Sequence, residues 1–175
     1  MTYRVLMVCT GNICRSAMAE IVLNEKLRAL GLDAEVDSAG ISDEEHGGPI
    51  DRRAARTLRN AGYQVPSHRA HQVQPHELHD YDLVLAMTSH HYSVLENLAR
   101  RANITTTTHR EPGDPNTIDL RMFRAFEPGA ENSPRRRALD VPDPWYGTQE
   151  DFEHTLETIE AAAPGITNHV ATQTK

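Results

Sequence analysis

Short apolar segments alternate along the chain with longer segments of helical periodicity. Residues 2–8 and 82–87 are dominated by apolar side chains, which is typical of strands buried on both faces of a parallel sheet. A shorter segment at 34–37 predicts a second strand, and Ser38-Ala39-Gly40 predicts a turn out of it. Residues 117–123 predict a further strand in spite of their imperfect alternation.

Apolar residues at helical spacing occur in four segments, at residues 17–30, 52–61, 89–101 and 150–163. Gly31 predicts the end of the first helix, and Asp51 is placed to cap the second. Thr148 with Asp151 resembles a capping box at the start of the last helix. Pro164-Gly165 predicts that this helix ends there, because proline lacks the N–H that an interior helical position donates.

Strands that alternate with helices predict an α/β fold, with a parallel sheet and helices on both faces. The 175 residues suit a single domain spanning 1–175, and no internal repeat or linker divides them. In such sheets ligands bind beyond the carboxyl ends of the strands, where the strand order reverses. Four loops are predicted: an acidic, glycine-rich one at 41–50, a histidine-rich one at 67–79, and two others at 105–116 and 127–143.

Composition excludes several classes of protein. With 38% hydrophobic and 25% charged residues, the chain resembles neither disordered nor membrane proteins, and no apolar run approaches the ~20 residues that span a bilayer. A net charge of −7 argues against general nucleic-acid binding. Two cysteines make neither a disulfide framework nor a zinc site. Without a secretory signal a cytoplasmic location is expected, although export by a signal-less route would leave no mark in the sequence.

The segment between the first strand and the first helix carries the most distinctive chemistry. It reads Cys9-Thr10-Gly11-Asn12-Ile13-Cys14-Arg15-Ser16. A tight loop at a helix N-terminus presents backbone N–H groups to an anion, and the planar guanidinium of Arg15 suits two phosphate oxygens. These groups favour the thiolate form of Cys9. The pattern therefore predicts a nucleophilic cysteine at the bottom of an oxyanion site.

Each of these residues also has an ordinary interpretation. A lone cysteine after a strand is usually a small buried side chain, and an arginine at a helix start is usually a surface charge. The functional interpretation is favoured because the same segment contains Gly11, Asn12 and Ser16. These residues suit unusual backbone angles or local hydrogen bonds. The Gly-Lys-Ser/Thr ending of nucleotide-binding phosphate loops is absent, so nucleotide hydrolysis is not favoured.

Hydrolysis of a phosphate ester at such a cysteine also needs an acid for the leaving group. Two Asp-Pro pairs place a carboxyl group before a stiff residue, Asp114-Pro115 and Asp143-Pro144. Most such pairs are merely turns. Trp145 and Tyr146 follow Asp143 and could flank a phenyl ring, which favours Asp143 as the acid.

Together, Cys9–Ser16 and Asp143-Pro144-Trp145-Tyr146-Gly147 resemble the motifs of the low-molecular-weight protein tyrosine phosphatase family, over nearly the whole chain. The resemblance implies a sheet of four parallel strands. It implies hydrolysis of phosphotyrosine, an aryl phosphate monoester, through a cysteinyl-phosphate intermediate and without a cofactor. In that reaction Cys9 is the nucleophile, Arg15 binds phosphate, and Asp143 acts as general acid and then as general base.

The resemblance implies further roles around the same loop. Phosphate is expected to be bound by the run Thr10, Gly11, Asn12, Ile13, Cys14 and Arg15. Asn12 is expected to hold the strained shape of the loop, with Ser38 and His68 in the same network, although ordinary turn chemistry would also explain the last two. Ser16 is expected to donate a hydrogen bond to the Cys9 sulfur, a role that is compatible with capping the helix.

One departure from the family pattern concerns the choice of substrate. The loop at 41–50 lines the pocket mouth in relatives and often carries an aromatic residue, whereas here it includes Asp43-Glu44-Glu45-His46-Gly47-Gly48. Trp145 stands where a tyrosine is more usual, and with Tyr146 it is expected to form the wall beside the substrate ring. Phosphotyrosine should still be accepted, and the acidic loop should disfavour acidic peptides.

Three other features have competing interpretations. In relatives, a cysteine placed like Cys14 can form a reversible disulfide with the nucleophile under peroxide, although Cys14 could also be a packing residue. The run Arg135–Arg137 is interpreted as a solvated loop, with attraction of acidic substrate segments as the alternative. No metal site is predicted, because the spacing of the clustered histidines matches no known ligand pattern; they are His68, His71, His76 and His79.

Three rival functions remain to be compared with phosphotyrosine hydrolysis. An arsenate reductase shares this loop, but its chemistry usually relays electrons through further cysteines, which are absent here. A module that only binds phosphotyrosine would have lost the nucleophile or the acid, and both are present. A general acid phosphatase acting on small metabolites is harder to exclude. The expected partners are tyrosine-phosphorylated proteins and phosphate or other oxyanions, with neither nucleic acid nor membrane.

Overall fold

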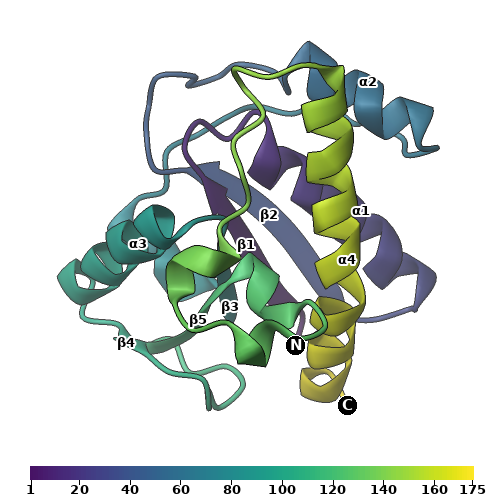
Figure 1. Cartoon of the computed structure of the whole chain (residues 1–175). Coiled ribbons are helices and arrows are strands. Elements are labelled where there is room, and N and C mark those ends of the chain that lie inside the picture. Colours follow the sequence, from purple (N-terminus) through teal and green to yellow (C-terminus); the bar gives the residue numbers. More distant parts are fainter.

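A computed structural model describes all residues, 1–175, as a parallel sheet flanked by helices (Figure 1). The strands are β1 (Tyr3–Cys9), β2 (Ala34–Gly40), β3 (Leu83–Ala86), β4 (Thr105–Thr106) and β5 (Thr117–Met122). They lie in the order β2-β1-β3-β5-β4, and every pair of neighbours is parallel. The predicted α/β fold is therefore confirmed.

Four α-helices cover the two faces of the sheet: α1 (Arg15–Ala29), α2 (Arg52–Asn60), α3 (Ser89–Arg101) and α4 (Gln149–Gln173). On one face α1, α2 and α4 pack against alternate residues of β1, including Val5 and Met7. On the other face α3 packs with the intervening residues Leu6 and Val8 (Figure 1). None of these helices combines the length and the apolar character that crossing a membrane requires.

The strand order reverses at β1, which has β2 on one side and β3 on the other. The chain leaves β1 through the loop that precedes α1, so this loop lies at the carboxyl edge of the sheet beside the point of reversal. This is the place where open α/β sheets bind their ligands. The fold thus brings the segment Cys9–Ser16 to the expected ligand-binding edge.

Two expectations about the strands were wrong. The sheet has five strands, because Thr105–Thr106, expected to be loop, pairs with Thr117 and Ile118 of β5. The segment 38–40 does not turn but continues β2, with Gly40 paired to Cys9. A Cβ added at Gly40 would lie 2.5 Å from the carbonyl oxygen of Thr10. The small residues that suggested a turn therefore allow β2 to approach the loop after β1.

The expected end of the last helix at Pro164-Gly165 was also wrong, since α4 continues to Gln173. A proline inside a helix costs about 3 kcal/mol. Beyond the proline, however, α4 buries Ile166 and Val170 completely, and each such side chain contributes roughly 1.5–3 kcal/mol. A side chain at Gly165 would collide with the carbonyl oxygen of Phe126, so glycine here serves close packing rather than a helix end.

Two predicted helix caps are present, although α1 begins at Arg15 and not at residue 17. Asp51 accepts hydrogen bonds from the backbone N–H groups of Arg53 and Ala54, and so caps α2. Thr148 and Asp151 form the capping box of α4. This last cap fixes where the mostly exposed segment 142–147 joins the helix, and that segment contains the second motif.

Candidate active site

A cavity of about 160 Å³ opens at the carboxyl end of β1. Three segments that are far apart in the sequence line it: the loop after β1, the acidic loop at 44–45 and the segment 143–146. The lining residues are Cys9, Thr10, Gly11, Ile13, Cys14, Arg15, Glu44, Glu45, Asp143, Trp145 and Tyr146. The structure therefore brings both sequence motifs to a single small cavity.

The first turn of α1 is left free to bind an anion. The N-cap residue Cys14 makes no side-chain capping bond, and no acidic residue lies in the first turn. The N–H groups at the start of a helix have no intrahelical acceptor, so they need a partner from elsewhere. Here they face no competing carboxylate on their own helix, as an oxyanion site at a helix N-terminus requires.

Cys9 is 3% exposed and lies 3.0 Å from the hydroxyl of Ser16, measured between Sγ and Oγ. The side chain of Asn12 determines which way this hydrogen bond runs. Its Oδ1 accepts from the backbone N–H of His71, at 3.2 Å, which fixes the orientation of the amide. Its Nδ2 then donates to the hydroxyls of Ser16, at 2.9 Å, and Ser38, at 2.8 Å. The hydrogen of the Ser16 hydroxyl is thereby left for the Cys9 sulfur.

Asn12 itself is fully buried and has a φ of 60°, an unusual backbone angle for a residue other than glycine. His68 holds this conformation from outside, because its Nε2 lies 2.6 Å from the Asn12 carbonyl oxygen. A carbonyl can only accept, so Nε2 must be the protonated ring nitrogen. Glu20 closes the network, with one carboxylate oxygen accepting from Ser38 and lying 3.9 Å from His68 Nδ1.

Glu20 had not been expected at the site. Burial raises the pKa of its carboxyl group, and the hydrogen bond from Ser38 opposes that shift. Glu20 lies one helical turn after Ser16, on the same side of α1. That spacing is the only sequence signal that could have pointed to it.

Arg15 links the two motifs. Its side chain is 5% exposed, and Nη1 donates to the carbonyl oxygen of Val141 at 3.0 Å. Its Nη2 lies 3.5 Å from Oδ2 of Asp143, whose other carboxylate oxygen accepts from the backbone N–H of Trp145 at 3.1 Å. The Asp143 carboxylate therefore lies beside the guanidinium at the cavity that Cys9 also lines.

Asp114, the competing Asp-Pro pair, lies elsewhere. Its carboxylate accepts from the backbone N–H of Asn116 at 2.9 Å and from the hydroxyl of Thr117 at 3.1 Å, closing a local turn. Thr117 begins β5, so this turn is at the amino end of the sheet, opposite the cavity. The structure thus brings Asp143, and not Asp114, to Cys9 and Arg15.

The sequence was compared with known protein families and the fold with solved structures. The family profile described as "Low molecular weight phosphotyrosine protein phosphatase" matches residues 4–175. The chain belongs to this family. A curated relative from Streptomyces coelicolor, "Low molecular weight protein-tyrosine-phosphatase", is 38% identical over 168 residues, covering 95% of this chain and 92% of the relative. The chain is accordingly a protein-tyrosine phosphatase.

Solved structures agree with this assignment. The crystal structure of YfkJ from Bacillus subtilis matches this phosphatase with a TM-score of 0.81 and 27% identity, over 100% of this chain and 98% of YfkJ. Wzb from Vibrio vulnificus, solved in complex with benzylphosphonate, matches with a TM-score of 0.72 and 27% identity, over 97% and 99% of the two chains. The fold of this phosphatase is thus one that these solved structures share.

Two further contacts at the site of this phosphatase escaped the sequence analysis. His91 of α3 is 2% exposed, and its Nε2 lies 2.8 Å from the hydroxyl of Thr10. Burial, followed by the charge of Arg15, lowers the pKa of His91 to about 3, so the ring is neutral near pH 7. The sequence placed His91 only at a helix start, since nothing in local spacing connects it to a loop 81 positions away.

Arg53 is the second unexpected residue. It donates from Nη1 to the carbonyl oxygen of Trp145 at 3.0 Å, and its guanidinium lies 5.3 Å from the centroid of the Trp145 ring. Two further bonds, each of 3.2 Å, tie it to the carboxylate of Asp51. Arg53 therefore joins the first turn of α2 to the aromatic wall, in which Trp145 is 38% and Tyr146 94% exposed.

Both cysteines are free and buried. Burial raises the pKa of the Cys14 thiol, and the nearby Asp51 carboxylate raises it further, so Cys14 is a protonated thiol at neutral pH. The disulfide with Cys9 under peroxide stays a prediction.

Three of the four clustered histidines have separate partners. His68 contacts Asn12, His71 pairs with Glu77 at 3.2 Å, and His79 Nδ1 lies 2.8 Å from the Pro115 carbonyl oxygen. No group of three side chains suited to hold a metal ion occurs in the structure.

Proposed function

We propose that this phosphatase hydrolyses phosphotyrosine in phosphorylated proteins through a phosphate ester of Cys9, with Arg15 as the phosphate ligand and Asp143 as the proton donor. One observation carries the proposal: these three side chains surround the same cavity of about 160 Å³, at an uncapped helix N-terminus. The benzylphosphonate held by the related Wzb supports a ligand that combines a tetrahedral oxyanion with a phenyl ring.

In the first step the Cys9 thiolate attacks phosphorus, an S–P bond forms and the P–O bond to the tyrosine ring breaks. The attack brings an anion to an anion, so the charge on the three equatorial oxygens must be neutralised. The partial positive charges of the N–H groups, in the loop and in the first turn of α1, stabilise these oxygens together with the guanidinium of Arg15. The leaving phenolate takes a proton from Asp143, which lines the same cavity.

Ser16 assists both steps through its hydroxyl hydrogen. Because the Ser16 oxygen accepts from Asn12, its hydrogen is directed to the Cys9 sulfur 3.0 Å away. That hydrogen bond stabilises the thiolate before attack. It stabilises the same sulfur again when the thiolate leaves in the second step.

In the second step Asp143, now ionised, takes a proton from a water molecule, whose oxygen attacks phosphorus. The S–P bond breaks, inorganic phosphate is released and the Cys9 thiolate is restored. Without substrate, Nη2 of Arg15 lies 3.5 Å from the Asp143 carboxylate. Phosphate binding would exchange that ion pair for bonds to phosphate oxygens, while the bond from Nη1 to Val141 keeps the guanidinium in place.

Trp145 and Tyr146 form the wall against which the phenyl ring would lie. On the other side Glu44 and Glu45 line the mouth, so the entrance carries negative charge on that side. Two buried, unbridged cysteines suit a reducing compartment, and we place the protein in the cytoplasm.

Turnover of p-nitrophenyl phosphate and of a phosphotyrosine peptide by the wild type and by Cys9→Ser tests the proposal. We expect Cys9→Ser to lose both activities while it still binds vanadate or phosphate, because the anion site remains. Cys14→Ser is the matched control and should retain activity, since only the backbone N–H of Cys14, which the substitution keeps, is expected to bind phosphate. Equal loss in both variants, or turnover by Cys9→Ser, would overturn the assignment of the nucleophile.

A further inference from the structure

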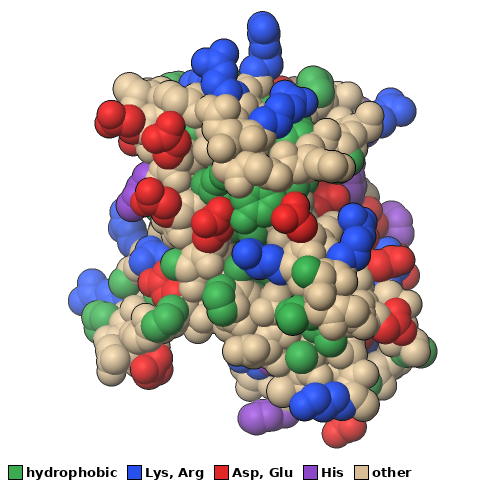
Figure 2. All heavy atoms as spheres, turned by 90° about the vertical axis from the view of Figure 1, so that its right-hand side faces the viewer, with side chains coloured by type: hydrophobic (Ala, Val, Ile, Leu, Met, Phe, Trp, Pro, Cys, Tyr) green, Lys and Arg blue, Asp and Glu red, His purple; other side chains and the backbone are tan.

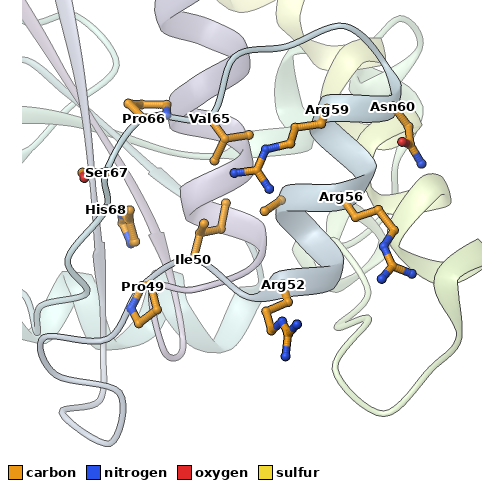
Figure 3. Close-up of a pocket in the computed structure, with 11 residues that line it drawn as sticks. Pro49, Ile50, Arg52, Arg56, Arg59, Asn60, Val65, Pro66, Ser67 and His68 are labelled. Carbon is orange, nitrogen blue, oxygen red and sulfur yellow. The ribbon is translucent and has the colours of Figure 1, made fainter.

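The largest cavity of the protein lies outside the active site. Its volume is about 640 Å³, and it lies between α2 and the segment 65–68 (Figure 3). Residues that line this cavity lie next to the phosphate-binding loop. Ile50 lines the large cavity and the next residue, Asp51, donates from its backbone N–H to the carbonyl oxygen of Ile13 at 2.9 Å. His68, which also lines it, contacts the backbone of Asn12.

Three arginines of α2 border this cavity: Arg52, Arg56 and Arg59. Their spacing places them on one face of the helix, and all three are exposed. Figure 3 shows them projecting from successive turns, with the guanidinium of Arg59 directed toward Val65. None of the three makes an ion pair or a side-chain hydrogen bond, in contrast to Arg53, which is bound to Asp51.

The protein as a whole is acidic, with a net charge of −7, so a cavity bordered by three arginines without carboxylate partners differs from its overall charge. Figure 2 shows lysine and arginine side chains gathered at the end of the molecule where α2 lies. Like charges spaced one helical turn apart repel one another and destabilise the helix by a few tenths of a kcal/mol per pair. The α2 arginines therefore lack a neutralising partner within the chain, and the cavity beside them is polar enough to accept a charged one.

The entrance of the active site is asymmetric in charge. Glu44 and Glu45 line one side of the entrance. On the other side lies Trp145, whose carbonyl oxygen accepts a hydrogen bond from Arg53 of α2. A peptide chain that leaves the catalytic cavity on the side of Glu44 meets negative charge. A chain that leaves it over Trp145 reaches the start of α2, where Arg52 precedes Arg53, so the two directions are electrostatically different for an acidic peptide.

We propose that Arg52, Arg56 and Arg59, with the cavity beside them, bind an acidic segment of the phosphoprotein substrate next to its phosphotyrosine. This inference rests on the proposed function, since it concerns the substrate of the same active site. The guanidinium groups match the carboxylates of such a segment and can bind them in pairs of hydrogen bonds. The acidic loop at 43–45 then sets the direction in which the peptide lies, rather than excluding acidic peptides altogether.

The test compares the triple variant Arg52→Gln/Arg56→Gln/Arg59→Gln with a control triple, Arg28→Gln/Arg100→Gln/Arg101→Gln. The control removes the same net charge from exposed arginines at the ends of α1 and α3. Glutamine keeps helix propensity. The substrates are p-nitrophenyl phosphate and two phosphotyrosine peptides of equal length, one flanked by glutamates and one by glutamines.

We expect the α2 triple to lower kcat/KM for the acidic peptide about 5- to 20-fold, because each exposed ion pair contributes modestly. The neutral peptide and p-nitrophenyl phosphate should be unaffected, and the control triple should lower none of the three by a comparable factor. The effect should also fade as the salt concentration rises toward ~1 M, where the Debye length is about 3 Å.

The outcomes separate this inference from the proposed function. If wild type turns over p-nitrophenyl phosphate but treats both peptides alike, or if both triples behave alike, the acidic docking site is wrong and the catalytic proposal stands. If wild type turns over none of the substrates, the proposed function fails first. A wild-type preference for the acidic peptide that survives in the α2 triple would likewise overturn the site.

Discussion

The two halves of the active site are held in different ways. In the phosphate-binding loop Asn12 and Ser16 are fully buried, and a network that also includes Ser38 fixes their side chains. The segment that carries the acid is mostly exposed, with the Asp143 side chain 47% and Tyr146 94% exposed. Arginines from two helices hold this segment in place: Arg15 donates to the carbonyl oxygen of Val141, and Arg53 donates to that of Trp145.

This contrast indicates that the two segments have different roles. The loop that binds the oxyanion is preorganised, so little free energy is lost in ordering it when phosphate binds. The segment with the acid has few buried contacts and can adjust to the leaving group. Damage to the loop should therefore reduce every reaction at the site, whereas damage to the acid segment should reduce only reactions that need a proton for the leaving group.

The largest difference should follow Asp143→Ala. We expect kcat for phosphotyrosine to fall about 10²–10³-fold, which is in the range of general acid catalysis. The loss should be smaller for p-nitrophenyl phosphate, because nitrophenolate leaves without a full proton transfer. Steady-state kinetics on a series of aryl phosphates measures both.

Asp114→Ala is the control for this comparison, since its carboxylate only closes a turn at the opposite edge of the sheet. It should leave the kinetics of all aryl phosphates unchanged. A uniform loss across the Asp143→Ala series, independent of the leaving group, would contradict the role of Asp143 as the acid.

A smaller effect is expected for Ser16→Ala. A hydrogen bond to a charged group contributes about 1.5–3 kcal/mol, so kcat should fall roughly 10- to 100-fold for every substrate, good leaving groups included. Alkylation of Cys9 by iodoacetate at neutral pH should slow in parallel. Ser38→Ala is the matched control, because Ser38 accepts from the same Asn12 amide but does not touch the sulfur. If Ser38→Ala slowed alkylation as much as Ser16→Ala, the direct bond would not be the cause.

The smallest effect at neutral pH should follow His91→Gln, which keeps a polar side chain beside Thr10. The pKa of His91 is about 3 in the folded protein and near ~6.5 when unfolded, so the unfolded chain binds the extra proton between these values. The contribution of His91 to the free energy of unfolding should be fully present above pH ~6.5. It should fall as the pH drops toward 3, by up to about 1.4 kcal/mol per pH unit.

Urea unfolding of wild type and His91→Gln between pH 4 and about 7 measures how the free energy of unfolding depends on pH. The difference between the two slopes is due to His91, because the contributions of the other groups cancel. His154→Gln, an exposed histidine on α4, is the control and should keep the wild-type slope. An unchanged slope in His91→Gln would mean that the buried ring is not neutral.

The sequence predicted those parts of the molecule that local chemistry specifies. Cys9, Arg15 and Ser16 lie within eight consecutive residues, so the roles of Cys9 and Arg15 could be proposed from their spacing and that of Ser16 from the family resemblance. The caps at Asp51 and Thr148 were likewise local. Asp143 was chosen over Asp114 through the aromatic residues beside it and the family resemblance, and the structure places it at the cavity.

The remaining features depend on contacts between distant segments. His91 reaches Thr10 and Arg53 reaches Trp145 only because the fold brings α3 and α2 to the site. Gly165 signals a helix end locally, but packing against Phe126 requires a glycine there. In each case a tertiary contact outweighs the local preference, which is why residue patterns alone mispredicted the last helix and missed His91 and Arg53.

We propose that the preorganised loop holds Cys9 as the group that accepts the phosphoryl group. The most direct measurement is rapid acid quenching during turnover of p-nitrophenyl phosphate, followed by mass spectrometry of the proteolytic peptides. We expect a phosphoryl group on the Cys9 side chain, accompanied by a burst of nitrophenolate before steady turnover. Phosphate on any other residue, or turnover with no burst and no phosphorylated Cys9 at any quench time, would contradict it.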